Sequence, residues 1–294
     1  MSYRIVKNLF GTSTREVVSI VDIPYTISDF CFIPEFGYLL ALRDNHCIAH
    51  VDINGGLTLP WVGALDEPGQ EDGSREYARL SYPSSLSYVP KFRKAFVIEG
   101  GGAILRAIEL DSGYIHNVIG SATINRLKKM TAKLSVADIN TACYANNLQE
   151  VYWCSDRLNR CFRFRQGDVD CILGNGKQGY SVSSDFRKST LYYPSGITVV
   201  SNAVYVSDKG NHCIRELTPK RLRLFEGTPI EKDIVDAPSK LKTYKGVFYY
   251  VDGDSIKHFS PNGPSRGSVY EGNGIVSLDM QGNNLLILEK EDAT

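Results

Sequence analysis

Residues 193–214 read YPSGITVVSNAVYVSDKGNHCI, and in this stretch two strand-like runs are followed by a tight turn. Apolar residues alternate with small or polar ones in the runs, as in half-buried β-strands. The turn contains Asp, Gly and Asn, which tolerate the positive φ that a tight turn requires. The stretch therefore predicts antiparallel strands joined by hairpins.

The turn of this stretch recurs along the chain. VSDKGNHCI at 206–214 returns as ALRDNHCI at 41–48 and, more loosely, as CSDRLNRCF at 154–162 and VIEGGGAIL at 97–105. Self-similarity of this kind indicates a repeat architecture. No segment sustains a helical period over three turns, so we predict an all-β chain.

A longer segment precedes the hairpin in three of the repeats. LGNGKQGYSVSSDFRKSTLYYP at 173–194 parallels VGALDEPGQEDGSREYARLSYP at 62–83, and residues 119–140 form a degraded copy. Pro83 and Pro194 lie 111 residues apart, which is two periods of about 55 residues. That period is long for four strands, so we interpret these segments as loops that cross from one repeat to the next.

The repeats predict a single closed β-propeller over residues 1–294, with six blades of four antiparallel strands. Five or seven blades remain open, because the last repeats are shorter and weaker. The first strand of each blade is expected near Ser28–Ile33, Ser84–Val89, Asn140–Ala145, Ser195–Val200, Lys240–Tyr244 and Gly274–Met280.

The two ends of the chain are expected to complete one blade together. Residues 9–24 resemble residues 224–238, which places the N-terminus inside a repeat, at its expected outermost strand. The residues from 274 onward supply only the first two strands of a repeat. A strand near residues 5–10 should therefore pair with a blade that also contains residues 285–288. This closure would hide the sheet edges that an open array exposes.

The repeat resembles that of the NHL family, in which a Gly-rich loop and a Pro lead to a strand and then to Val-x-Asp-x-x-Asn-His-x-Ile. Residues 193–214 keep Pro194, Gly196, Val206, Asp208, Asn211, His212 and Ile214. Residues 62–83 match the loop half with Gly69, Asp72, Gly73, Ala78, Leu80 and Pro83. The resemblance implies structural roles for the motif residues Asn45, His46, Asp208, Asn211 and His212. It indicates fold far better than function, because propellers host many unrelated roles.

Charge and composition argue against several classes of protein. Lys plus Arg (33) balance Asp plus Glu (33), so no global field attracts nucleic acid or an anionic membrane. No signal peptide or long apolar span is visible, and we expect a cytoplasmic protein without a membrane partner. The seven cysteines show no CxxC spacing. We expect reduced thiols, with Cys47, Cys161 and Cys213 as small buried side chains.

Some propellers similar to this one are metal-dependent lyases or lactonases. Such enzymes need three protein ligands that converge on one ion. The positions where the first strands are expected to begin offer a single carboxylate, Asp29, among serines and other small polar residues. We therefore identify no catalytic residue, no metal ligand and no cofactor, and favour binding over catalysis. A metal-dependent lyase or lactonase is the alternative.

The crossing loops 64–79, 121–135 and 175–190 hold the extra length of the repeats and are expected on one rim. Because Tyr, Phe and Arg are common at interface hot spots, we predict that a partner docks there. The predicted binding residues are Arg75, Tyr77, Arg126, Lys129, Tyr180, Phe186 and Arg187. The competing interpretation is that the aromatic residues only pin their own loops to the sheet.

The expected partner is a protein or a glycan, with the chain as one subunit of a larger assembly. A phage virion or tail is one such assembly, so a place in a virus particle is also considered. Single-stranded RNA is a further alternative for the loop face. The acidic residues of loop 64–79 disfavour it, because they interrupt an even track for phosphates.

Overall fold

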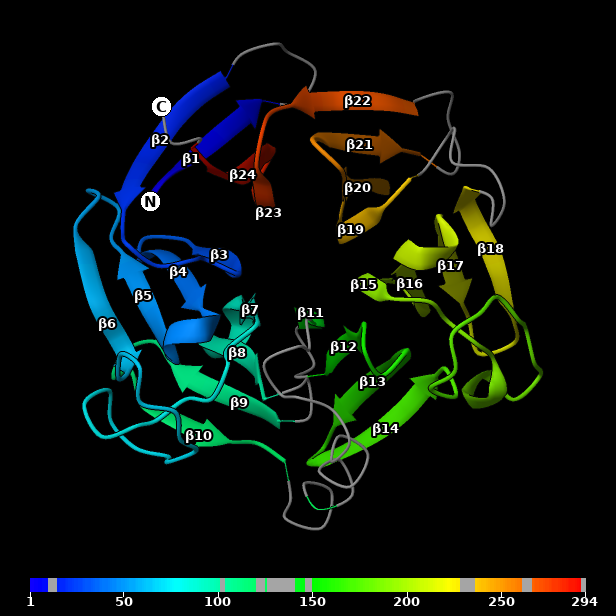
Figure 1. The fold of residues 1–294 in the computed structure, drawn as a ribbon, viewed down its shortest axis with the longest axis horizontal. Helices are drawn as coiled ribbons and strands as arrows, with labels where there is room; N and C mark the ends of the chain where they lie inside the picture. The colour runs from blue at the N-terminus through cyan, green and yellow to red at the C-terminus, as the bar shows by residue number, and fades with distance from the viewer. Residues whose placement is uncertain are drawn as a thin grey trace.

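The computed structural model describes residues 1–9, 15–100, 104–119, 125, 141–145, 150–227, 236–260 and 266–291. They form six antiparallel sheets of four strands each, arranged around a central axis as the blades of a β-propeller (Figure 1). The all-β class, the six blades and the four strands per blade are confirmed.

The first three blades follow the chain from the inside outward. Blade 1 contains β3 (Asp29–Ile33), β4 (Gly37–Leu42), β5 (Cys47–Val51) and β6 (Leu57–Gly63). Blade 2 contains β7 (Ser85–Val89), β8 (Lys94–Glu99), β9 (Ile104–Glu109) and β10 (Ile115–Asn117). Blade 3 contains β11 (Thr141–Ala145), β12 (Val151–Ser155), β13 (Arg160–Arg165) and β14 (Asp168–Leu173).

The last three blades include the one that joins the chain ends. Blade 4 contains β15 (Pro194–Val200), β16 (Ala203–Asp208), β17 (Cys213–Leu217) and β18 (Leu222–Gly227). Blade 5 contains β19 (Pro238–Tyr244), β20 (Val247–Asp252), β21 (Ser255–Phe259) and β22 (Arg266–Glu271). Blade 6 contains β23 (Ile275–Gln281), β24 (Asn284–Lys290), β1 (Ser2–Leu9) and β2 (Arg15–Asp22). All six predicted first strands are present and lie innermost (Figure 1).

Blade 6 closes the ring with strands from both ends of the chain. β1 lies between β24 and β2, with Ile5 opposite Leu288 and Asn8 opposite Leu285. Tyr3 and Ile5 are fully buried. The predicted blade that joins residues 5–9 to residues 285–288 is therefore confirmed. The expectation that the N-terminal strand is the outermost one is wrong, because β1 is the third strand of this blade and β2 is the outermost.

The repeat motif forms the turn between the second and third strands. His46 and His212 follow the short 3-10 helices η1 (Arg43–Asn45) and η5 (Lys209–Asn211), with φ of 58° and 53°. His46 Nδ1 accepts a hydrogen bond from the backbone N–H of Tyr82 at 3.2 Å, and His212 Nδ1 contacts the carbonyl of Asp236. Both histidines therefore hold the turn of one blade against the chain segment that enters the next blade.

The two asparagines of the motif bond the same turns to the crossing loops. Asn45 Nδ2 donates to Asp66 Oδ1 at 2.8 Å. Asn211 Nδ2 donates to Asp208 Oδ2 at 2.8 Å and to the carbonyl of Gly179 at 3.0 Å. All of these motif residues thus make contacts inside the fold.

The core lies between neighbouring blades. Phe96 of blade 2 packs in one apolar cluster with Trp153 and Phe162 of blade 3, whose rings stack at 5.3 Å. Cys47, Cys161 and Cys213 are buried free thiols, as predicted. Burial raises the pKa of Cys47 and Cys213 to about 12, so these cysteines stay protonated and behave as small apolar residues.

Candidate functional site

The first strands surround a central channel, in which two lysines of β19 form ion pairs. Lys240 Nζ lies 3.1 Å from Asp29 Oδ1, and Lys242 Nζ lies 3.1 Å from Asp279 Oδ1. The register of β19 shifts between Ser239 and Lys242, and Lys240 adopts a φ of 49° at this shift. The irregularity allows both lysines to reach carboxylates of other blades.

Asp29 ties four blades together at the axis. Besides Lys240 of blade 5, it accepts hydrogen bonds from Ser85 Oγ at 2.8 Å, Leu86 N at 3.0 Å and Ser277 Oγ at 2.6 Å. Burial alone would raise the pKa of Asp29. The Lys240 ammonium and the Ser277 hydroxyl outweigh burial and hold this pKa below its usual value. The single carboxylate expected at the strand starts therefore belongs to an ionised network that joins the blades.

The channel has a cavity at each end, and these two cavities are called its mouths. The loop-side mouth, where the first strands begin, is a cavity of about 560 Å³ lined by Arg157, Tyr193, Lys209, His212, Asp236 and Lys240, among others. Serine hydroxyls at this mouth bond to the neighbouring blade: Ser28 Oγ to the Pro83 carbonyl at 3.3 Å, and Ser195 Oγ to the Pro238 carbonyl at 2.7 Å. The serines at the strand starts thus serve as links between blades.

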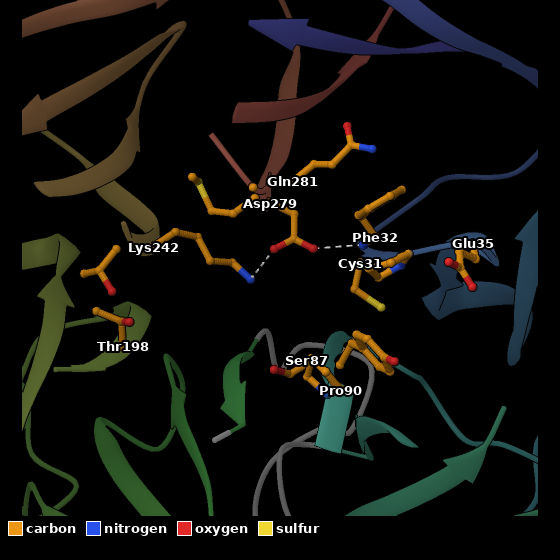
Figure 2. Close-up of a pocket in the computed structure, with 14 residues that line it drawn as sticks. Cys31, Phe32, Glu35, Ser87, Pro90, Thr198, Lys242, Asp279 and Gln281 are labelled. Carbon is orange, nitrogen blue, oxygen red and sulfur yellow. Dashed lines mark hydrogen bonds and ion pairs between the residues drawn. The ribbon is translucent and has the colours of Figure 1, made fainter. Parts of the chain in front are cut away.

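The turn-side mouth, where the first strands end, is a second cavity of about 500 Å³ (Figure 2). Lys242 and Asp279 form their ion pair on its wall, and Asp279 Oδ2 also accepts a hydrogen bond from the backbone N–H of Phe32 at 2.9 Å. Sequence reasoning missed both residues. The sequence did carry a signal for them: each is the charged residue of a strand end that is otherwise uncharged, KTY at 242–244 and DMQ at 279–281.

The buried side chain of Arg106 holds the blade 2 crossing loop (residues 64–79) in place. Its guanidinium donates to the carbonyls of Arg79 and Glu71, both at 2.6 Å, and to Asp72 Oδ1 at 2.8 Å. Its contact with the buried carboxylate of Glu99 is longer, at 3.4 Å. One side chain therefore fixes both ends of the segment 71–79.

Arg215 has the same role under the blade 4 crossing loop (residues 175–190). It is fully buried and donates to the carbonyls of Thr190 at 2.8 Å and Ser181 at 3.0 Å, and to Asp208 Oδ2 at 3.2 Å. Arg106 and Arg215 occupy equivalent positions, opposite Val97 and Val206 of the preceding strands. Sequence reasoning missed both arginines. The available signal was an acid followed seven positions later by an arginine in both repeats, Glu99 with Arg106 and Asp208 with Arg215.

The structure separates the predicted binding residues of the blade 2 crossing loop from the channel. Gly73 pairs with Ile115 of β10, so this loop extends along the outer edge of blade 2. Arg75 is exposed and lies beside Gly113, and 78% of Tyr77 is exposed. Arg126 and Lys129 lie outside the described residues.

The predicted residues of the blade 4 crossing loop divide into two groups. Tyr180 is 40% exposed and stacks on the guanidinium of Arg215, with 4.8 Å between Cζ and the ring centroid. Phe186 is half-buried against the core between blades 3 and 4, and exposed Arg187 pairs with Asp185 at 3.0 Å. The contacts of Phe186 are those of a residue that pins its own loop.

The stability of the propeller should depend on pH through Glu99. Burial raises the pKa of Glu99 to about 7, although Arg106 partly offsets this effect. Because the folded protein holds the proton of Glu99 more tightly than the unfolded chain, this group contributes fully to stability below pH 4.5, the unfolded pKa. The contribution is lost as the pH rises through about 7, the folded pKa. Between pH 4.5 and 8, the free energy of unfolding of the wild type should fall by up to about 3 kcal/mol more than that of Glu99→Gln, which lacks the titrating group. Urea unfolding of both proteins at several pH values measures this; a difference independent of pH would contradict the assignment.

The described part of the chain contains no group of three or more His, Cys, Asp or Glu side chains placed to hold a metal ion. No helix in the same residues is long and apolar enough to cross a membrane. The charged groups that do meet are ion pairs and buried arginine networks. The arginine networks hold the crossing loops, and the ion pairs of the lysines lie in the walls of the two cavities.

Comparison with known proteins identifies an NHL repeat at residues 191–217. NHL repeat-containing protein 2 of Gallus gallus is 22% identical over 184 residues, covering 56% of this chain and 25% of that protein. The Bos taurus protein of the same name is 20% identical over 202 residues, covering 64% of this chain and 28% of its own. The resemblance to NHL-repeat propellers is confirmed, and the match spans about a quarter of these relatives.

Solved structures share the fold at low sequence identity. A chain of the nidogen/laminin complex superposes with a TM-score of 0.60 at 13% identity, covering 90% of this chain and 91% of that chain. A streptogramin B lyase gives 0.57 at 11% identity, covering 99% and 89%. Similarity at this level establishes the propeller fold alone.

Proposed function

We propose that this six-bladed β-propeller with an NHL repeat is a binding module that captures a protein partner at the loop-side mouth. The observation that carries the proposal is the blade 4 crossing loop, which is held on buried Arg215. It exposes Tyr180 and Val182, at 40% and 55%, next to the turn that lines this mouth. A binding role requires no catalytic group.

The loop is organised before any partner arrives. Arg215 fixes its backbone at Ser181 and Thr190, and Asn211 of the turn η5 bonds to the carbonyl of Gly179. A preorganised loop loses little conformational freedom on binding, so its contacts contribute more fully to affinity. Tyr180 is further oriented by its stacking on Arg215.

Lys209 offers a cation to an acidic side chain of the partner at this mouth, whose other charged lining residues are Arg157, Lys240, Asp156 and Asp236. Among the described residues, Lys209 makes no ion pair or side-chain hydrogen bond, and it borders the cavity of about 560 Å³. The guanidinium of Arg157 lies 5.9 Å from the ring centroid of Tyr193 on the same wall. Tyrosine and arginine are among the residue types enriched at the hot spots of protein interfaces.

Two further considerations support a protein as the partner. The nidogen/laminin complex contains a chain of the same fold within a protein assembly. The exposed Arg75 and Tyr77 of blade 2 offer a second contact for a partner large enough to reach the outer edge of the ring. A glycan at this mouth, a cytoplasmic location and a place in a virus particle remain predictions from the sequence.

Replacing Tyr180 by Ser together with Lys209 by Glu should abolish capture of the partner. Tyr180 supplies apolar contact area, and the reversed charge would repel the acidic group expected opposite Lys209. Quantitative affinity capture from the native source, with cross-linking and mass spectrometry, should show at least about a tenfold loss of one specific protein. Circular dichroism checks that the variant is folded.

Ile20→Ser is the matched control, because Ile20 is 60% exposed on β2, the outer strand of blade 6. This variant should capture the partner as the wild type does. Equal capture by the folded double variant, or loss of capture with Ile20→Ser alone, would place the interface elsewhere.

A further inference from the structure

We propose that the turn-side mouth binds a neutral polyhydroxylated ligand of about the size of one sugar ring. The site lies at the opposite end of the channel from the proposed protein interface and does not depend on it. Its cavity of about 500 Å³ is within the range of small-molecule sites. Figure 2 shows the ion pair of Lys242 and Asp279 in the cavity, with Phe32, Ser87, Pro90 and Gln281 around it.

The ion pair keeps hydrogen-bonding capacity for a ligand. Among the described residues, Asp279 is the only hydrogen-bond partner of the Lys242 ammonium, which leaves donors unused. Asp279 accepts from Lys242 and from the N–H of Phe32, one bond at each oxygen, so both oxygens can accept again. A donor and an acceptor therefore lie 3.1 Å apart on the wall of the cavity.

The charges around the cavity favour an uncharged ligand. Asp279 and Glu35 outnumber Lys242 in the lining, which disfavours an anion. Burial opposes the charge of Lys242, but the carboxylates of Asp279 and Asp29 outweigh it and raise the pKa of Lys242. The lysine stays protonated, so Asp279 already has a cationic partner and a second cation would gain little there. Two adjacent hydroxyls can donate to Asp279 and accept from Lys242 without breaking the ion pair.

The remaining walls suit the two faces of a sugar ring. Phe32 and Tyr88 supply aromatic surface, on which the apolar face of such a ring can pack. Gln281 and Thr243 supply further polar groups at the rim. Thr198 is fully buried at the edge of the cavity, and its hydroxyl has no hydrogen-bond partner within the described residues. This set of groups matches several hydroxyls better than a single charged group.

Saturation-transfer NMR and titration calorimetry with the methyl glycosides of glucose, galactose and mannose test the proposal. At least one glycoside should bind saturably, and Asp279→Asn should weaken its binding by at least about tenfold, because a charge-assisted hydrogen bond is lost. Asp279→Asn retains the size of the side chain and an acceptor for the N–H of Phe32. Gln281→Ala, at a half-buried residue of the lining, should weaken binding less and should not affect folding.

Lys240→Met is the matched control, because Lys240 lies on the same strand and makes an equivalent ion pair at the other mouth. It should lose stability, as Lys242→Met should, but keep glycoside affinity within about twofold. Three results would overturn the proposal: no binding of any of the three glycosides, binding that Asp279→Asn leaves unchanged, or binding of glycine or inorganic phosphate in their place.

Discussion

Deletion of residues 1–9 is expected to yield a protein that no longer unfolds cooperatively. The deletion removes β1, which lies between β24 and β2 and carries the buried side chains of Tyr3, Ile5 and Val6. Burial of three such side chains contributes about 5–9 kcal/mol. That is comparable to the entire stability of a typical domain. β2 would also lose its pairing partner, and β24 would become an exposed edge.

Thermal and urea unfolding, followed by circular dichroism, measure this effect. Ile5→Ala is a graded version that keeps every backbone hydrogen bond and should cost about 2–5 kcal/mol. Lys7→Ala is the control on the same strand, because its ion pair with Glu16 is exposed. A truncated protein that melts at the temperature of the wild type would show that blade 6 does not need the N-terminal strand.

Arg215→Met should destabilise the propeller by about 3–5 kcal/mol, because it leaves the buried carboxylate of Asp208 without its ion pair. Burial already raises the pKa of Asp208, and Arg215 opposes that rise. Without Arg215 the pKa rises further, so the carboxyl can take up a proton at low pH. The loss of stability should therefore be smaller at pH 5 than at pH 8.

Arg163→Met is the comparison, because its contact with Asp170 at 3.3 Å is much more exposed than that of Arg215 with Asp208 and should contribute less than about 1 kcal/mol. Urea unfolding of both variants at the two pH values separates the effects. Arg215→Met should also release the blade 4 crossing loop and weaken capture of the partner. Equal stability of the two variants would mean that Arg215 does not anchor the loop.

The sequence alone determined the repeat, the first strands and the closure of the ring. These features follow from local rules: alternation of apolar residues sets the strands, and Asp, Gly and Asn set the turns. The match between residues 9–24 and 224–238, together with the incomplete C-terminal repeat, was enough to predict that both chain ends share a blade, although not that β1 is its third strand. Neighbouring residues, or one repeat beside the next, carry the information that these features require.

Tertiary structure alone decided which charged residues are buried. In the sequence, Arg106 and Arg215 resemble ordinary solvated arginines, because burial depends on loops that return from a distance along the chain. The carbonyl of Glu71 lies 35 positions from Arg106, and that of Ser181 lies 34 positions from Arg215. The pairs Lys242–Asp279 and Lys240–Asp29 likewise form only where strands of different blades meet at the axis. A charge is stable in such a place only when its partner arrives with the fold, so its role cannot be deduced from its own segment.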